Sequence, residues 1–172
     1  HQQSLDIALA IKDRQGEGQI LSFLWDVHDF RGETGIALEH YGQAVEIATV
    51  IGDRFGEADA LKKIANIQRR RGNYVEALTS YEQTQIIAIE IQDKKGIGDS
   101  LKGIGQINAD QYQYDEAQRN YLQALDILAE LGDKAGEGDM RLTIGQLYAN
   151  QSQYTVALGY YQQALDIHIT ID

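Results

Sequence analysis

The chain of 172 residues contains no cysteine and no proline. Without cysteine it forms no disulfide and offers no thiolate to a metal or a substrate. Proline ends or kinks helices, so its absence permits long uninterrupted ones. No apolar run approaches the roughly 20 residues that a membrane-spanning helix needs. These absences favour a helical protein that does not bind a membrane.

Positive charge is also scarce. The chain has 15 Lys and Arg against 26 Asp and Glu, which gives a formal net charge of −11. Binding to nucleic-acid phosphates needs a surplus of Lys and Arg. We therefore expect no nucleic acid partner and no docking on an anionic membrane.

Residues for catalysis or metal binding are not gathered into a known pattern. The four histidines, at positions 1, 28, 40 and 168, form no close pair with metal-ligand spacing. The glycine-rich stretch GIGDSLKG at 96–103 is followed by Ile104 and not by the Lys-Ser/Thr of a phosphate-binding loop. The sequence predicts no enzyme, no cofactor and no metal site.

A 40-residue period organises the whole chain. The stretch DRQGEGQ at 13–19 returns as DRFGEAD at 53–59, DKKGIGD at 93–99 and DKAGEGD at 133–139. One register holds alanine in every period, and a second holds tyrosine: Ala37, Ala77, Ala117 and Ala157, then Tyr41, Tyr81, Tyr121 and Tyr161. Self-similarity at a fixed period of this size indicates a repeat architecture.

The period divides residues 1–172 into a single array of repeats. The predicted repeats are 13–52, 53–92, 93–132 and 133–172. Residues 1–12, HQQSLDIALAIK, match the last twelve residues, YQQALDIHITID, and are interpreted as part of the second helix of a preceding repeat. The chain is therefore expected to be a fragment of a longer array.

Each period predicts two helices, of about 14 and about 18 residues, because apolar residues recur at helical spacing. The repeated Asp of each joint is a predicted N-cap, and the glycine three residues later stands where a Cβ could clash with the preceding hairpin. Small residues at 65, 105 and 145 are expected to keep the first helix thin where the second crosses it, and the tyrosines to fill the wider gap between hairpins.

The pattern L-x-x-I-[AG] followed by A-x-x-x-Y-x-x-A resembles the tetratricopeptide repeat. The match is best to the subclass with 40-residue units, found in spindle-orientation scaffolds, kinesin light chains and bacterial signalling proteins. The resemblance implies an all-α fold, an α-solenoid of antiparallel helix pairs wound into a right-handed superhelix. It also implies that first helices line a concave groove that binds a protein or peptide. A cytoplasmic location is expected.

Four first-helix registers, spaced i, i+3 or i+4, share one helix face and form the predicted partner-binding set. The central register is rich in amides, which suit a partner backbone because they both donate and accept. The predicted residues are Gln19, Phe23, Asp26 and Phe30; Asp59, Lys63, Asn66 and Arg70; Asp99, Gln106 and Asp110; and Asp139, Thr143, Gln146 and Asn150.

Two functional hypotheses stay open. The chain is either a scaffold that binds a peptide or partner helix in the groove, as part of a larger multidomain protein, or a structural spacer or self-association module without a groove ligand. The helix expected at 154–171 is as apolar as the internal ones, with Leu165, Ile167 and Ile169 in sequence. Terminal repeats normally need a polar outer face, so we also expect end-to-end self-association.

Overall fold

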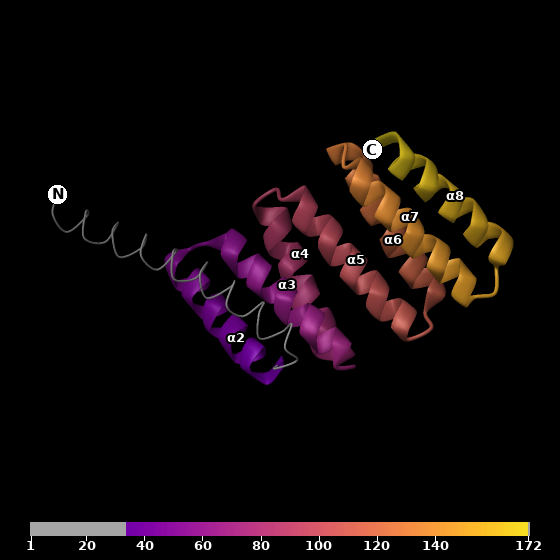
Figure 1. The fold of residues 1–172 in the computed structure, drawn as a ribbon. Coiled ribbons are helices and arrows are strands. Elements are labelled where there is room, and N and C mark those ends of the chain that lie inside the picture. The colour runs from indigo at the N-terminus through magenta and orange to yellow at the C-terminus, as the bar shows by residue number, and fades with distance from the viewer. Residues whose placement is uncertain (1–33, 172) are drawn as a thin grey trace. The chain divides into compact units, whose positions relative to one another are not determined.

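A computed structural model describes residues 34–171, and within that range the structure is α-helix joined by short turns, with no strand. The helices are α2 (Thr34–Ile51), α3 (Arg54–Arg70), α4 (Tyr74–Glu90), α5 (Lys94–Asp110), α6 (Tyr114–Leu131), α7 (Lys134–Asn150) and α8 (Tyr154–Ile171) (Figure 1). The expected helix at 1–12 and the first helix of repeat one lie outside the described residues. The predicted all-α class is confirmed.

The chain divides into two compact units, an N-terminal unit up to Ile91 and a C-terminal unit from Gln92. The described part of the N-terminal unit holds α2 and the hairpin α3–α4. The C-terminal unit holds the hairpins α5–α6 and α7–α8. The helices of each hairpin are antiparallel because only a short turn joins them. The handedness of a superhelix over the whole array stays a prediction.

The first helices are longer than the sequence analysis predicted. Helices α3, α5 and α7 each have 17 residues, against the expected 14 or so. Each of these helices begins directly after the repeated aspartate, so the joint glycine lies within its first turn. The second helices have 17 or 18 residues, as expected.

The joint aspartates cap the helices as predicted in two of the three described repeats. Asp53 accepts a hydrogen bond from the backbone N–H of Gly56 at 2.9 Å, and Asp133 accepts one from Gly136 at 2.8 Å. Asp93 occupies the N-cap position of α5 but makes no such side-chain bond. Side-chain capping therefore differs between repeats that share the same aspartate.

The joint glycines leave room mainly for the capping carboxylate. A Cβ added at Gly56 would lie 2.6 Å from Oδ2 of Asp53, and one at Gly136 would lie 2.5 Å from Oδ2 of Asp133. Of these two, only Gly136 would also place a Cβ against the preceding hairpin, with Leu128 Cδ2 at 2.9 Å. The expectation of a clash with the preceding hairpin is thus correct for Gly136 and not for Gly56, where the nearest atoms belong to the cap itself.

The small and large registers pack as the sequence predicted. The register alanines at 37, 77, 117 and 157 are buried, and Tyr41 packs with Ile64 and Ile67 of the following hairpin. Tyr121 and Tyr161 also lie close against the first helix of their own hairpin. A Cβ at Gly105 would lie 2.6 Å from the ring of Tyr121. Tyr121 also packs in one cluster with Met140 and Ile144 of the following hairpin, so it fixes both the spacing within its hairpin and the contact to the next one.

Most helices end on a residue in the left-handed conformation. Glycine takes this position after α2, α3 and α6, at Gly52, Gly72 and Gly132. Elsewhere it is a residue with a Cβ: Gln92, Tyr112 and Ser152 have φ of 59°, 63° and 59°. Such residues pay a steric cost that glycine avoids.

Candidate functional site

The predicted partner-binding residues that the structure describes lie on α3, α5 and α7. Their spacing places each set along one side of its helix, which we call the first-helix face. The four predicted residues of repeat one, Gln19, Phe23, Asp26 and Phe30, lie outside the described residues. The others are divided between the two compact units, so their joining into one groove stays a prediction.

On α3 the charges of the first-helix face already have partners. Asp59 forms ion pairs with Lys62 at 3.6 Å and Lys63 at 3.7 Å. The Lys63 ammonium also lies 5.5 Å from the centre of the Tyr41 ring, a cation–π contact. An anionic partner group at Lys63 must therefore compete with Asp59. Arg70 lies in the last turn of the same helix.

On α7 the same registers form a short polar chain. Gln146 donates from Nε2 to Oδ1 of Asn150 at 2.9 Å. Thr143 donates its hydroxyl to the backbone carbonyl of Asp139 at 2.9 Å, and the Asp139 carboxylate lies 3.6 Å from His168 of α8. The polar surface here is therefore held largely by local bonds.

On α5 the predicted residues differ in their exposure to solvent. Gln106 is half-buried between Gly105 and Ile107, which are both buried. Asp99 is half-buried and Asp110 is exposed, at opposite ends of the helix. This helix carries carboxylates at both ends of its face and an amide at the centre.

The central amides also have a role inside the repeat. The hydroxyl of Tyr81 donates to Oδ1 of Asn66 at 2.8 Å, and that of Tyr161 donates to Oε1 of Gln146 at 3.5 Å. The amide oxygen therefore gives the tyrosine hydroxyl a hydrogen-bond partner within the hairpin. This bond also orients Asn66, since its oxygen faces the tyrosine and its NH₂ group is directed elsewhere.

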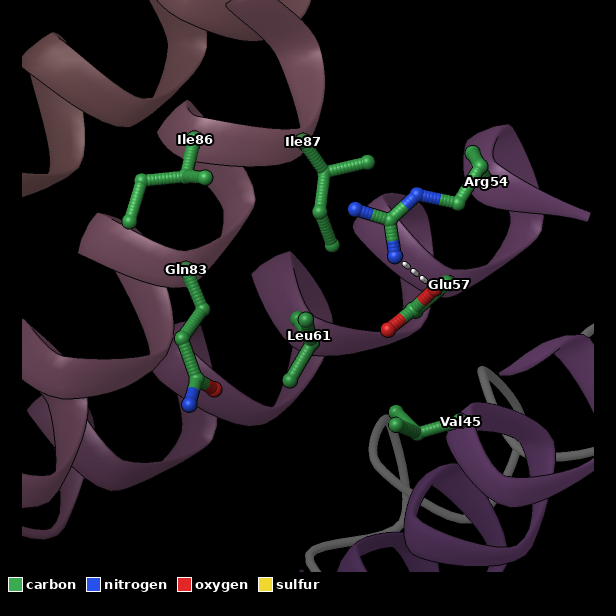
Figure 2. Close-up of a pocket in the computed structure, with 7 residues that line it drawn as sticks. All are labelled: Val45, Arg54, Glu57, Leu61, Gln83, Ile86 and Ile87. Carbon is green, nitrogen blue, oxygen red and sulfur yellow. Dashed lines mark hydrogen bonds and ion pairs between the residues drawn. The ribbon is translucent and has the colours of Figure 1, made fainter. Parts of the chain in front are cut away.

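A second surface, which the sequence analysis did not identify, carries a pocket in the N-terminal unit. The pocket has a volume of about 330 Å³ and lies where α2, α3 and α4 meet. We call it the repeat-two pocket, and its lining residues are Val45, Arg54, Glu57, Leu61, Gln83, Ile86 and Ile87 (Figure 2). Leu61 lies between Glu57 and Gln83, so an apolar floor separates a carboxylate from an amide.

Charged groups close one side of the repeat-two pocket. Arg54 donates to Oε2 of Glu57 at 2.7 Å and also forms an ion pair with Glu90 at the end of α4. The hydrogen bond to Glu90, with a smaller contribution from Glu57, raises the pKa of the Arg54 guanidinium above its usual value. One cation thus serves two carboxylates, which leaves this group with a net negative charge.

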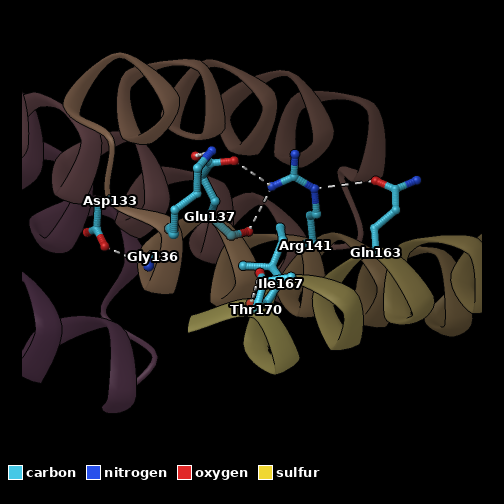
Figure 3. Close-up of polar contacts among 8 residues, drawn as sticks. Asp133, Gly136, Glu137, Arg141, Gln163, Ile167 and Thr170 are labelled. Atoms are coloured by element: carbon cyan, nitrogen blue, oxygen red, sulfur yellow. Dashed lines mark hydrogen bonds and ion pairs between the residues drawn. The ribbon is translucent and has the colours of Figure 1, made fainter. Parts of the chain in front are cut away.

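The equivalent positions in repeat four hold a filled cluster. Residues 137, 141 and 163 stand 80 positions after 57, 61 and 83, and they are Glu137, Arg141 and Gln163. Arg141 donates from Nη1 to Oε2 of Glu137 at 3.2 Å and from Nε to Oε1 of Gln163 at 3.3 Å (Figure 3). In repeat four a guanidinium therefore bonds to a carboxylate and an amide at the positions that correspond to Glu57 and Gln83 in repeat two.

Glu137 is buried and accepts from two cations. Lys134 donates to its Oε1 at 2.6 Å while Arg141 holds Oε2. The hydrogen bond from Lys134 lowers the pKa of the Glu137 carboxyl; burial opposes this shift, and Arg141 adds to the lowering. The carboxylate is thus stable in its charged form although its side chain is only 5% exposed.

The signal for this second surface is a break in one register of the repeat. Positions 21, 61 and 101 are leucine, whereas position 141 is arginine. The glutamine register at 43, 83, 123 and 163 never changes. A charged residue at an otherwise apolar register indicates a specific partner nearby, but only the structure identifies Glu137 and Gln163 as those partners.

Among residues 34–171, no group of three or more His, Asp or Glu side chains is arranged to hold a metal ion. Within the same range, no helix is both long and apolar enough to cross a membrane.

The fold and its repeated faces define a helical-repeat protein, and a comparison with family models identifies the repeat family. The family model of the tetratricopeptide repeat matches residues 56–130 and 96–169, which together make up more than half of the chain. The chain belongs to the tetratricopeptide repeat family. Family membership makes it a protein-interaction scaffold in general terms. No curated protein is significantly similar in sequence.

Solved structures share the fold at low sequence identity. BtubC (BKLC) from P. vanneervenii is 19% identical with a TM-score of 0.78, over 90% of this chain and 64% of its own. Aspartyl phosphate phosphatase F from Bacillus subtilis is 15% identical with a TM-score of 0.84, over 92% and 42%. A Rap protein complexed with competence and sporulation factor is 18% identical with a TM-score of 0.76, over 88% and 43%. The chain thus spans less than two thirds of each of these proteins.

Proposed function

We propose that the chain binds an extended protein segment along its first-helix face, in the concave groove that the resemblance implies. The proposal assigns no reaction and no cofactor to the chain, and it treats the array as the recognition part of a larger multidomain protein. The observation that carries it is the orientation of Asn66. Because Tyr81 donates to the amide oxygen, the NH₂ group is available to a carbonyl of a partner backbone.

Charge on α3 supports the same surface. Lys63 is half-buried and held between Asp59 and the Tyr41 ring, so its ammonium is positioned before a partner arrives. Arg70 lies two turns further along the same face. A partner carboxylate near these two residues adds a favourable contact, whereas the aspartates at 59, 99 and 139 repel an acidic tail at the start of each helix.

The Rap structure supports a protein ligand for this fold by analogy. That Rap protein is complexed with competence and sporulation factor. At 18% identity the likeness is one of fold, so the chemistry of the ligand for this chain comes from its own residues.

The test is a selection followed by calorimetry. Random dodecapeptides displayed on phage are selected against the full chain, and the bound peptides are titrated into wild type and into the double variant Lys63→Glu, Arg70→Glu. We expect the variant to weaken binding by tenfold or more, about 1.4 kcal/mol.

The matched control reverses a charge on another helix. Glu82 is exposed on α4, so Glu82→Lys is expected to change the affinity by less than twofold. Equal weakening by the control and the double variant would refute a site on the first-helix face, and so would peptides that still bind the double variant fully.

A second candidate function is self-association through α8. Leu158, Leu165 and Ile169 of this helix are 67%, 52% and 65% exposed, so burial against another copy would be favourable. Sedimentation over a hundredfold concentration range tests it. We expect Leu158→Lys with Ile169→Lys to abolish any association; a wild type that stays monomeric throughout would refute this candidate.

A further inference from the structure

The structure assigns to the repeat-two pocket the binding of an arginine side chain from a partner protein. This site lies apart from the first-helix face and does not depend on it. The juxtaposition of Glu57, Leu61 and Gln83 carries the inference. In repeat four the equivalent carboxylate and amide, Glu137 and Gln163, hold the guanidinium of Arg141.

The two clusters correspond in chemistry as well as position. In repeat four the carboxylate accepts from Lys134 through one oxygen and from Arg141 through the other. In repeat two Arg54 takes the place of Lys134 and bonds to Oε2 of Glu57. The other oxygen of Glu57 is the counterpart of the one that receives Arg141.

The charged group formed by Arg54, Glu57 and Glu90 in repeat two has one more negative charge than positive. Arg54 is shared by Glu57 and Glu90, which gives two negative charges and one positive. Repeat four has Thr170 at the position of Glu90, and there Glu137 is shared by two cations. Adding one guanidinium to the repeat-two group neutralises it, and the attraction is strengthened because the carboxylate is largely shielded from water.

The walls of the pocket fit the aliphatic part of an arginine side chain. Ile86 is 57% exposed at the pocket rim, whereas its register holds a carboxylate in the other repeats, at Glu46, Asp126 and Asp166. Together with Val45 and Leu61 it offers an apolar surface to the methylene groups. A volume of about 330 Å³ is also within the range of small-ligand sites.

Arginine fits better than lysine because its planar group donates in several directions. Arg141 uses Nη1 for the carboxylate of Glu137 and Nε for the amide of Gln163. An ammonium is a compact point charge and does not present this fixed fork of donors. Repeat three is an internal control, since it has Ile97 at the carboxylate position and Leu101 at the floor.

The experiment compares an arginine peptide with its neutral isostere on the full chain. Acetyl-Leu-Arg-Leu-amide and the citrulline peptide of the same sequence are titrated while amide chemical shifts are recorded by NMR. We expect the arginine peptide to shift the resonances of Glu57, Leu61 and Gln83 and to bind at least tenfold more tightly than the citrulline peptide.

Three variants sharpen the result. Leu61→Arg supplies the guanidinium internally and is expected to abolish those shifts, while Glu57→Gln is expected to weaken the arginine peptide about tenfold. Arg141→Leu is expected to create a second site, seen as new shifts at Gln163. Equal affinity for arginine and citrulline, or full binding to both Leu61→Arg and Glu57→Gln, would overturn the inference, and so would shifts confined to the first-helix face.

Discussion

The hairpins α3–α4 and α7–α8 share a backbone plan and differ at a few registers that decide their surfaces. Repeat two has Leu61 between a glutamate and a glutamine, and repeat four has Arg141 there. The first leaves a pocket lined by mixed chemistry, and the second fills the corresponding place with its own guanidinium. The Leu61/Arg141 register therefore carries the main difference between an apolar side chain that lines a pocket and a guanidinium that bonds within its own hairpin.

The same two hairpins also differ where the helices cross. Ala65 of repeat two is buried, whereas repeat four has Gly145 at that register, with Tyr161 against it. At the end of the first helix, repeat two has Gly72 and repeat four has Ser152 in the same left-handed conformation. Each difference gives an experiment on the comparison.

The largest effect is expected for Gly145→Val. A Cβ at this position would lie 2.5 Å from the Tyr161 ring and 3.3 Å from the backbone oxygen of Ala157. The hairpin must open to admit it, so we expect a loss of about 3 kcal/mol in the free energy of unfolding, measured by urea denaturation. In repeat two, Ala65→Val is expected to cost less, since that crossing already admits a Cβ; an equal or greater loss there would contradict the distinction.

A smaller effect is expected for the two glutamates. Glu137→Gln removes charge-assisted bonds from Lys134 and Arg141 and should lower the free energy of unfolding by about 2 kcal/mol. Glu57→Gln removes one such bond, to Arg54, and should cost less. Chemical denaturation of both variants checks the order, and a larger loss for Glu57→Gln would reverse our ranking of the two clusters.

The Glu137 cluster also predicts a pH dependence. Because its pKa is lowered in the folded chain, the unfolded state takes up a proton first as the pH falls. The stabilisation is therefore fully present above the ordinary pKa of a glutamate and is lost as the pH drops through the lower folded value. Glu137→Gln should lose less stability than wild type between pH 6 and acid; parallel curves would show that this carboxylate does not contribute.

The smallest effect is expected at the helix ends. Ser152→Gly relieves a left-handed residue that bears a Cβ and should raise the free energy of unfolding by about 1 kcal/mol. Gly72→Ser, the reverse exchange in repeat two, should lower it by a similar amount. Thermal unfolding of both variants checks the pair, and changes of the same sign would contradict it.

The fold was predictable because it depends on patterns that recur four times. The 40-residue period located the helices, and the alanine and tyrosine registers identified the packing residues. The predicted lengths of the first helices were too short, since α3, α5 and α7 each have 17 residues. The role of the joint glycines was predicted only in part, since the capping carboxylate occupies most of the space around them.

The functional surfaces were less predictable. The first-helix registers followed from the resemblance, yet the bond from Tyr81 to Asn66 joins residues on two helices and has no local sequence signal. The repeat-two pocket depends on Glu57, Leu61 and Gln83 from two helices and on Val45 from a third. The proposed role of these residues became apparent only from the bonds of Arg141 to Glu137 and Gln163 in the equivalent hairpin.

The most direct test of the central claim is a crystal structure of Leu61→Arg. The account predicts that the introduced guanidinium lies between Glu57 and Gln83 and donates to both, as Arg141 does to Glu137 and Gln163, and that the pocket is filled. A guanidinium directed into solvent, with Glu57 still bonded to Arg54 alone, would contradict the claim that the two hairpins share one arrangement for an arginine side chain.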